Sequence, residues 1–139
     1  MKVFAGLSVF MMLFFTSCGK DESLIPDVPV NLNIPVNDFR ISGLTTIAGK
    51  VIILEGHGVA GLILYSRLSD RVIVAYDRCS TVNPEKKNKL DLLAGSIVED
   101  KASGAQFNLE DGSAVKAPAT RSLKRYGVSS NGSTISVYN

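Results

Sequence analysis

Short apolar runs, each ended by residues that favour turns, recur along the chain from about residue 30 onward. Residues 30–34 alternate apolar with polar side chains, which is typical of a half-buried strand, and Pro35 favours a place at a sheet edge. The sequence has no helical period beyond residue 18. Other strand-like runs lie at residues 50–55, 62–65, 72–76, 96–98, 105–109, 127–130 and 134–138. Strands of this length, separated by short turns, predict a small all-β sandwich or barrel.

Several segments between these runs have the residues of tight turns. Glycines flank His57 in the segment 56–61, which predicts a turn between antiparallel strands. Asp111-Gly112 and Asn131-Gly132 predict two further hairpins, because Asp-Gly and Asn-Gly suit the backbone of short turns. Residues 83–89, NPEKKNK, are charged and turn-rich, and they predict an exposed loop whose lysines face solvent.

The first part of the chain predicts a targeting signal rather than a part of the fold. A basic start at Lys2 precedes an apolar run at residues 3–15 that is too short to cross a bilayer comfortably. Thr16-Ser17-Cys18 then resembles a bacterial lipobox, in which the cysteine is acylated and becomes the mature N-terminus. An ordinary secretory signal, cleaved elsewhere, is the alternative. We expect a lipoprotein signal peptide at 1–17, a lipidated N-terminus and tether at 18–27, and a domain at 28–139.

Lipidation of Cys18 predicts a protein attached to the bacterial cell envelope, at the outer membrane with a periplasmic or surface face, because two or three acyl chains give stable attachment. Of the two cysteines, Cys79 is then the only free thiol, so no disulfide forms within the chain. Loss of Lys2 with the signal lowers the formal charge from +2 to +1, which gives no reason to expect nucleic-acid binding. The membrane is the partner predicted here, and the identity of any envelope protein partner stays open.

The stretch 104–126, GAQFNLEDGSAVKAPATRSLKRY, resembles the second half of a Rieske-type [2Fe–2S] domain. In that family a Cys-x-x-His pair precedes a Gly-x-x-Phe, an Asp-Gly turn and a proline loop. The residues that keep this frame are Gly104, Phe107, Gly112, Pro118, Ala119, Thr120, Arg121, Leu123 and Tyr126. The resemblance covers residues 30–138 and implies a Rieske-like small antiparallel β sandwich or barrel, with a smaller, loop-rich subdomain where the family binds its cluster.

A Rieske cluster requires two thiolates on one iron and two imidazoles on the other. The resemblance places the first ligand pair at Cys79 and Thr81 and the second pair at Asp100 and Ser103, so only Cys79 is a competent ligand. The chain has one histidine, His57, which matches neither ligand loop. We therefore predict a Rieske-like domain that has lost its cluster, with no cofactor, metal or catalytic residue.

Other chemistry has little support in the sequence. Cys79 has only Arg78 nearby to activate a thiolate, so a buried residue that packs like a small apolar one is favoured. Glu55 and His57 fit a solvated turn better than an acid–base pair. Residues 120–125 resemble the strand that follows the proline loop in the family, and Tyr126 is expected to cover the edge of the core with its hydroxyl toward water or a backbone group.

The leading hypothesis is a lipid-anchored envelope protein whose degenerate Rieske-like domain acts as a binding or structural module and not as an enzyme. The alternative is a ferredoxin-type electron-transfer protein with an unusual iron–sulfur site, or with one completed by a partner. A third possibility is an unrelated β-sandwich lipoprotein. The arrangement of Cys79, Thr81, Asp100 and Ser103 separates these hypotheses, since a shared polar pocket favours a substitute ligand and a filled gap favours a relic.

Overall fold

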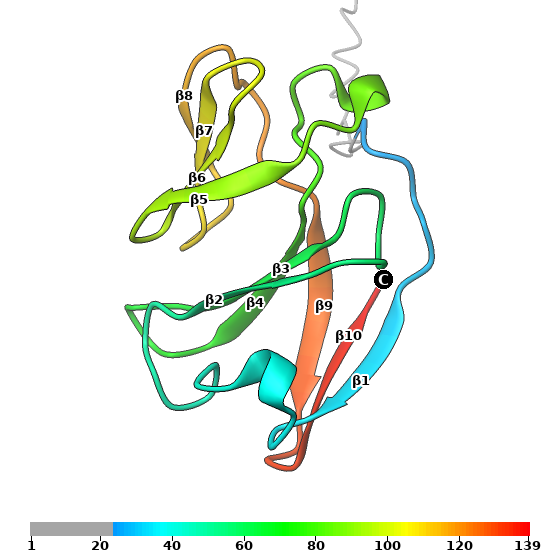
Figure 1. Cartoon of the computed structure of the whole chain (residues 1–139), viewed down its shortest axis with the longest axis vertical. Helices are drawn as coiled ribbons and strands as arrows, with labels where there is room; N and C mark the ends of the chain where they lie inside the picture. The colour runs from blue at the N-terminus through cyan, green and yellow to red at the C-terminus, as the bar shows by residue number, and fades with distance from the viewer. Residues whose placement is uncertain (1–23) are drawn as a thin grey trace, which may run out of the picture.

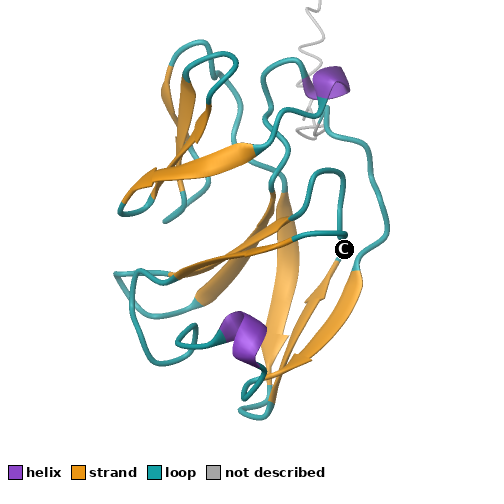
Figure 2. Ribbon diagram, in the orientation of Figure 1, coloured by secondary structure: helices purple, strands orange, loops and turns teal. Residues whose placement is uncertain are grey.

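The computed structural model of the protein describes residues 24–139. The predicted signal peptide and Cys18 lie outside these residues. Within the described range, no helix is long and apolar enough to span a bilayer. Strands make up most of the fold, and two short 3₁₀ helices lie near its opposite ends (Figure 2).

Six strands form the larger sheet, in the order β1-β10-β9-β4-β3-β2, and every neighbouring pair is antiparallel. These strands are β1 (Asn31–Pro35), β2 (Val51–Leu54), β3 (Leu62–Ser66), β4 (Ile73–Asp77), β9 (Arg125–Ser130) and β10 (Thr134–Tyr138). The pairing of β4 with β9 is confined to Ala75 with Tyr126 and Tyr76 with Arg125. Because the two strands separate beyond this point, the sheet curls, and β1, β10 and β9 enclose a core with β2, β3 and β4 (Figure 1).

Four strands form the smaller antiparallel sheet, in the order β5-β6-β7-β8. They are β5 (Leu90–Ala94), β6 (Ile97–Asp100), β7 (Ala105–Asn108) and β8 (Ala114–Lys116). Phe107 and Leu109 are fully buried in a second core between this sheet and the outer face of β3 and β4. The predicted inward alternation of these two residues is confirmed.

The strands β3 and β4 are buried on both faces. Leu62 and Leu64 of β3 contribute to the core inside the curled sheet, whereas Ile63 and Tyr65 contribute to the core under the smaller sheet. Alternation of polar with apolar residues is therefore absent from β3, and its sequence is nearly all apolar. The two cores share this central pair of strands.

The helices η1 (Phe39–Ile41) and η2 (Pro84–Lys86) occupy the long connections. Helix η2 lies within the predicted exposed loop at 83–89, and none of its residues is buried. Asp38 caps the N-terminus of η1, because its carboxylate accepts a hydrogen bond from the Arg40 backbone N–H at 2.9 Å.

The all-β class, the edge position of β1 and the predicted turns are confirmed. The sequence pattern missed β5, because its exposed Leu92 and Leu93 follow one another at a bulge and break the alternation of a half-buried strand. The prediction of a strand at residues 120–125 was wrong. β9 begins at Arg125, because the chain before it turns inward to bury Leu123.

Gly112 shows why the Asp-Gly turn needs glycine. Its φ is +80°, a region that residues with a side chain rarely adopt. A Cβ atom at this position would lie 2.8 Å from a ring carbon of Tyr76. The turn that connects β7 to β8 can therefore pack directly on the ring of Tyr76 in β4.

Candidate functional site

The resemblance places the first ligand pair at Cys79 and Thr81. The loop that carries these positions, which we call the first former ligand loop, begins at Cys79, two residues after β4. Cys79 is fully buried, in a small cluster with Ile25 and Ala60. Its Sγ atom lies 3.6 Å from the Ser80 carbonyl oxygen and 3.8 Å from that of Pro84. Burial, together with the negative charge of Asp77, raises the pKa of the Cys79 thiol to about 11. A thiol with this pKa is protonated at neutral pH and is a poor nucleophile.

Asp77 lies beneath this loop and is fully buried. Its carboxylate accepts hydrogen bonds from the backbone N–H groups of Val59 at 2.7 Å, Ala60 at 3.3 Å and Cys79 at 2.8 Å. The Tyr126 hydroxyl donates a fourth bond at 2.7 Å. Burial and this bond to Asp77 raise the pKa of Tyr126. The carboxylate therefore joins the glycine turn, β4 and β9 at one point.

The hydroxyl of Tyr126 was expected to face water or a backbone group, and that expectation was wrong. Gly58 explains how the glycine turn comes so close to the pair. A Cβ atom on Gly58 would lie 2.5 Å from the Asp77 carboxylate and 2.9 Å from the Tyr126 hydroxyl, and its φ is +63°. The turn at 56–61 thus needs glycine in order to cap a buried carboxylate.

The resemblance places the second ligand pair at Asp100, the last residue of β6, and Ser103, in the turn that leads to β7; we call this segment the second former ligand loop. Asp100 is buried, and it accepts hydrogen bonds from the Ser103 hydroxyl at 2.7 Å and from the Ala102 backbone N–H at 2.9 Å. Burial acts to raise the pKa of Asp100, but the bonds from Ser103, Ser80, Ala102 and other donors outweigh it and lower the pKa. The two residues predicted as the second pair therefore bond to each other.

The two former ligand loops contact each other, but the first loop does so through Ser80 and Asn88 and not through the predicted Cys79 and Thr81. Asn88 donates a hydrogen bond to Asp100 at 3.4 Å, and the Ser80 hydroxyl also bonds to this carboxylate. Thr81 points elsewhere, since its hydroxyl donates to the Arg121 carbonyl oxygen at 3.0 Å, in the loop that follows Pro118. In residues 24–139, every buried side-chain nitrogen and oxygen has a hydrogen-bond partner.

The residues at the four positions do not fit a Rieske cluster. Such a cluster needs two imidazoles and two thiolates, whereas Thr81 and Ser103 offer hydroxyl groups and Asp100 a carboxylate that already accepts several hydrogen bonds. Among the described residues, no group of three or more His, Cys, Asp and Glu side chains is arranged to hold a metal ion. His57 lies in the turn that packs near Cys79, but the chain has no second histidine.

An ion-pair network covers the outside of this end of the molecule. Arg78 pairs with Glu55 and, at 2.6 Å, with Asp91, and its Nε atom donates to the Leu90 carbonyl oxygen at 2.7 Å. Lys89 also pairs with Glu55, at 2.9 Å. Glu55 thus bonds to two cations, and the hydrogen bond from Lys89 is the largest cause of its lowered pKa. The Glu55 side chain is 58% exposed, which agrees with the solvated position expected for it.

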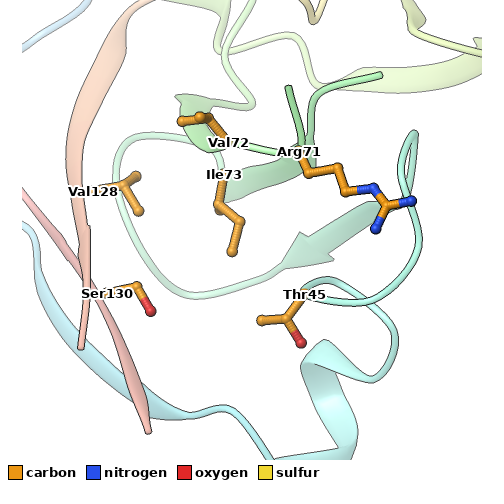
Figure 3. A pocket seen from close by; sticks show the side chains of 6 residues that line it. All are labelled: Thr45, Arg71, Val72, Ile73, Val128 and Ser130. Carbon is orange, nitrogen blue, oxygen red and sulfur yellow. The ribbon is translucent and has the colours of Figure 1, made fainter. Parts of the chain in front are cut away.

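A second feature is a hollow of about 340 Å³ at the opposite end of β4, where β4 and β9 separate. It is lined by Thr45, Arg71, Val72, Ile73, Val128 and Ser130. Three of these residues are apolar and three are polar, and the Arg71 side chain points away from Val128 and Ser130 (Figure 3). The sequence pattern gave no signal for this hollow, because it arises from the separation of two strands that are distant in the chain.

Sequence reasoning also missed Asp77, Tyr126 as its partner, and Ile25. A usable signal existed for Asp77, because a carboxylate at the end of an apolar strand must be bonded if the strand is buried. Ile25 carried no such signal, since it lies in a segment that was read as a tether. Its side chain is only 2% exposed.

No protein-family model matches the chain, and no curated protein matches it in sequence. Solved structures do match its fold. One is a complex of reduced oxygenase and oxidised ferredoxin in carbazole 1,9a-dioxygenase, at 18% identity and a TM-score of 0.52, covering 76% of this chain and 99% of that one. Another is a Sphingomonas yanoikuyae B1 ferredoxin, at 18% identity and a TM-score of 0.50, covering 69% of this chain and 92% of that one. The two-loop arrangement on an antiparallel base, together with these neighbours, identifies the domain as Rieske-like in fold.

Proposed function

We propose that this protein is a lipid-anchored envelope protein whose Rieske-like domain works without an iron–sulfur cluster, as a binding or structural module. The observation that carries the proposal is the bonding of the former ligand positions. Asp100 and Ser103 bond to each other at 2.7 Å, and Thr81 bonds to the Arg121 carbonyl oxygen. These residues stabilise the two loops in place of ligands.

The chain's composition supports the same proposal. One histidine and two cysteines are too few for the two imidazoles and two thiolates of a Rieske cluster if Cys18 carries lipid. The buried, protonated thiol of Cys79 is also unsuited to nucleophilic catalysis. The proposal therefore assigns the protein no enzymatic step.

The cluster proposal is tested by producing the protein with iron and sulfide supplied and measuring its visible absorption and its iron content. We expect no absorption typical of a [2Fe–2S] cluster and less than a tenth of an iron atom per chain. Stoichiometric iron and sulfide in the purified protein would overturn the proposal and would favour the electron-transfer alternative. In that case Cys79→Ser should abolish metal binding, because Cys79 is the only ligand position with a thiol.

The anchoring proposal is tested separately, by mass spectrometry of the N-terminal peptide from protein isolated from membranes. We expect the peptide to begin at Cys18 and to carry a diacylglyceryl group, and we expect Cys18→Ala to block the modification. An unmodified N-terminus at another residue would contradict lipid anchoring. That result would leave the cluster proposal untouched.

A further inference from the structure

We propose that the end of the domain that carries the former ligand loops faces the membrane and that Lys86 and Lys87 contact anionic lipid head groups there. The proposal rests on the lipidation of Cys18 proposed above. It adds an orientation and a binding surface, which lipidation alone does not specify. The surface consists of the exposed loop at 83–89 and the neighbouring turn at 101–104.

The N-terminal segment joins the domain at the end that carries the former ligand loops. Ile25 is buried against Ala60 and Cys79, at the first former ligand loop. The Lys124 ammonium group fixes the following residues, with a hydrogen bond to the Pro26 carbonyl oxygen at 2.9 Å and an ion pair with Asp27 at 2.8 Å. Cys79, which clusters with Ile25, has its Sγ atom 3.8 Å from the carbonyl oxygen of Pro84 in η2, and Figure 1 draws the first described residues, in blue, close to this helix.

Only a short length of chain connects this junction to the proposed lipid. Residues 19–24 separate Cys18 from Ile25. A fully extended chain gains at most about 3.5 Å per residue, so Ile25 lies within about 25 Å of the acylated residue. A domain of about 110 residues has a radius of gyration of about 13 Å and hence a diameter of about 35 Å. The tether is therefore too short for the opposite end of the docked domain, with η1 and the β9–β10 turn, to face the bilayer.

The surface that this tether brings to the membrane carries two unpaired lysines. Lys86 and Lys87 are exposed, and neither pairs with a carboxylate among the described residues, whereas Lys89 and Lys101 are paired with Glu55 and Asp91. A lysine close to an anionic bilayer strengthens attachment about fivefold. Two unpaired lysines on the membrane-facing end thus favour anionic over neutral lipids.

The test uses the lipidated full-length protein, purified from membranes and reconstituted in vesicles. The chain has no tryptophan, so a single introduced tryptophan reports its own position. Ala102→Trp places the reporter on the exposed turn at the former ligand end, and Ser133→Trp places a matched reporter on the exposed β9–β10 turn. Quenching is measured with nitroxide-labelled head groups, in phosphatidylcholine vesicles with and without phosphatidylglycerol.

We expect quenching of Ala102→Trp to exceed that of Ser133→Trp at least threefold, and to increase when phosphatidylglycerol is present. Lys86→Gln with Lys87→Gln should remove that increase. Lys50 precedes β2, whereas Glu55, which pairs with Lys89, follows the other end of this strand. Lys50→Gln is therefore the control and should leave the phosphatidylglycerol-dependent increase unchanged. Quenching of Ser133→Trp equal to that of Ala102→Trp would overturn the orientation, and insensitivity to phosphatidylglycerol would overturn the role of the two lysines.

Mass spectrometry of the same samples separates this inference from the anchoring proposal. If the acyl group is present and the quenching pattern is absent, the orientation is wrong and the lipid anchor stands. If the acyl group is absent, both proposals fail together.

Discussion

Replacing Tyr126 by phenylalanine tests the buried bond to Asp77 with little change in shape. The ring stays in the core, and the Asp77 carboxylate loses one of its four hydrogen bonds. Hydrogen bonds to charged groups contribute about 1.5–3 kcal/mol, and three backbone donors remain on the carboxylate. We therefore expect Tyr126→Phe to lower the free energy of unfolding by about 2 kcal/mol.

The assay is urea denaturation of the purified protein at pH 7, followed by circular dichroism. Tyr138→Phe is the control, because Tyr138 is 47% exposed and the change should stay within about 0.5 kcal/mol. In an Asp77→Asn background, removal of the Tyr126 hydroxyl should cost about 1 kcal/mol less than in the native chain, since the charge on the acceptor is gone. A loss below about 0.5 kcal/mol for Tyr126→Phe alone would refute the reasoning.

The same bond has a signature in alkaline solution. The pKa of Tyr126 is raised in the folded protein, so an unfolded tyrosine loses its proton at a lower pH than the folded one does. Because the unfolded state then binds fewer protons, the stability contributed by this group is fully present below about pH 10 and decreases as the pH rises further. Tyr126→Phe should therefore lose less stability than the native chain between pH 9 and pH 11. Parallel losses in the two proteins would show that another group titrates.

Three further predictions follow from neighbouring contacts. At pH 8 a thiol with a pKa of about 11 is about 200-fold less ionised than a free cysteine thiol, so alkylation of Cys79 should be at least 200-fold slower than that of a free cysteine. Ile25→Ser should accelerate this alkylation more than tenfold, because it uncovers the sulfur. Gly112→Ala should lower the free energy of unfolding, measured by urea denaturation, by about 2–4 kcal/mol, and Gly132→Ala by only about 1 kcal/mol. Both glycines have positive φ, but only at Gly112 would the added Cβ lie 2.8 Å from a ring carbon, that of Tyr76. Equal losses in the two variants would show that the Tyr76 ring does not matter. Ser103→Ala should lower the free energy of unfolding by about 1–2 kcal/mol at pH 7 and by less at pH 3. The pKa of its partner Asp100 is lowered in the folded protein, so the charged carboxylate contributes stability above about pH 4 that is lost on acidification. An equal loss at both pH values would refute the role of the charge.

Much of the fold follows from local sequence, because strands and tight turns depend on neighbouring residues. Alternation identified β1, Pro35 indicated its edge position, and Asn131-Gly132 identified the last hairpin. The pattern missed β5, where exposed Leu92 and Leu93 are adjacent at a bulge. Such a strand is defined by its partner β6, which a local pattern does not contain.

Few contacts of the candidate site could be predicted from the sequence. The motif frame predicted that Asp100 and Ser103 form a pair, and these two residues do bond to each other. It assigned Thr81 to the same site, although that side chain bonds to the loop after Pro118. The contact between Tyr126 and Asp77 joins residues 49 positions apart, so it depends on the pairing of β4 with β9 rather than on either local sequence.

The double burial of β3 and β4 has a consequence for how the molecule comes apart. Ile63 and Tyr65 support the smaller sheet from the same strand whose Leu62 and Leu64 fill the larger core. Detaching the smaller sheet would expose one whole face of that strand to water, and opening the larger core would expose the other. The slowest amide protons should therefore be those of β3 and β4, and they should exchange together, in a single global opening that leaves neither sheet standing.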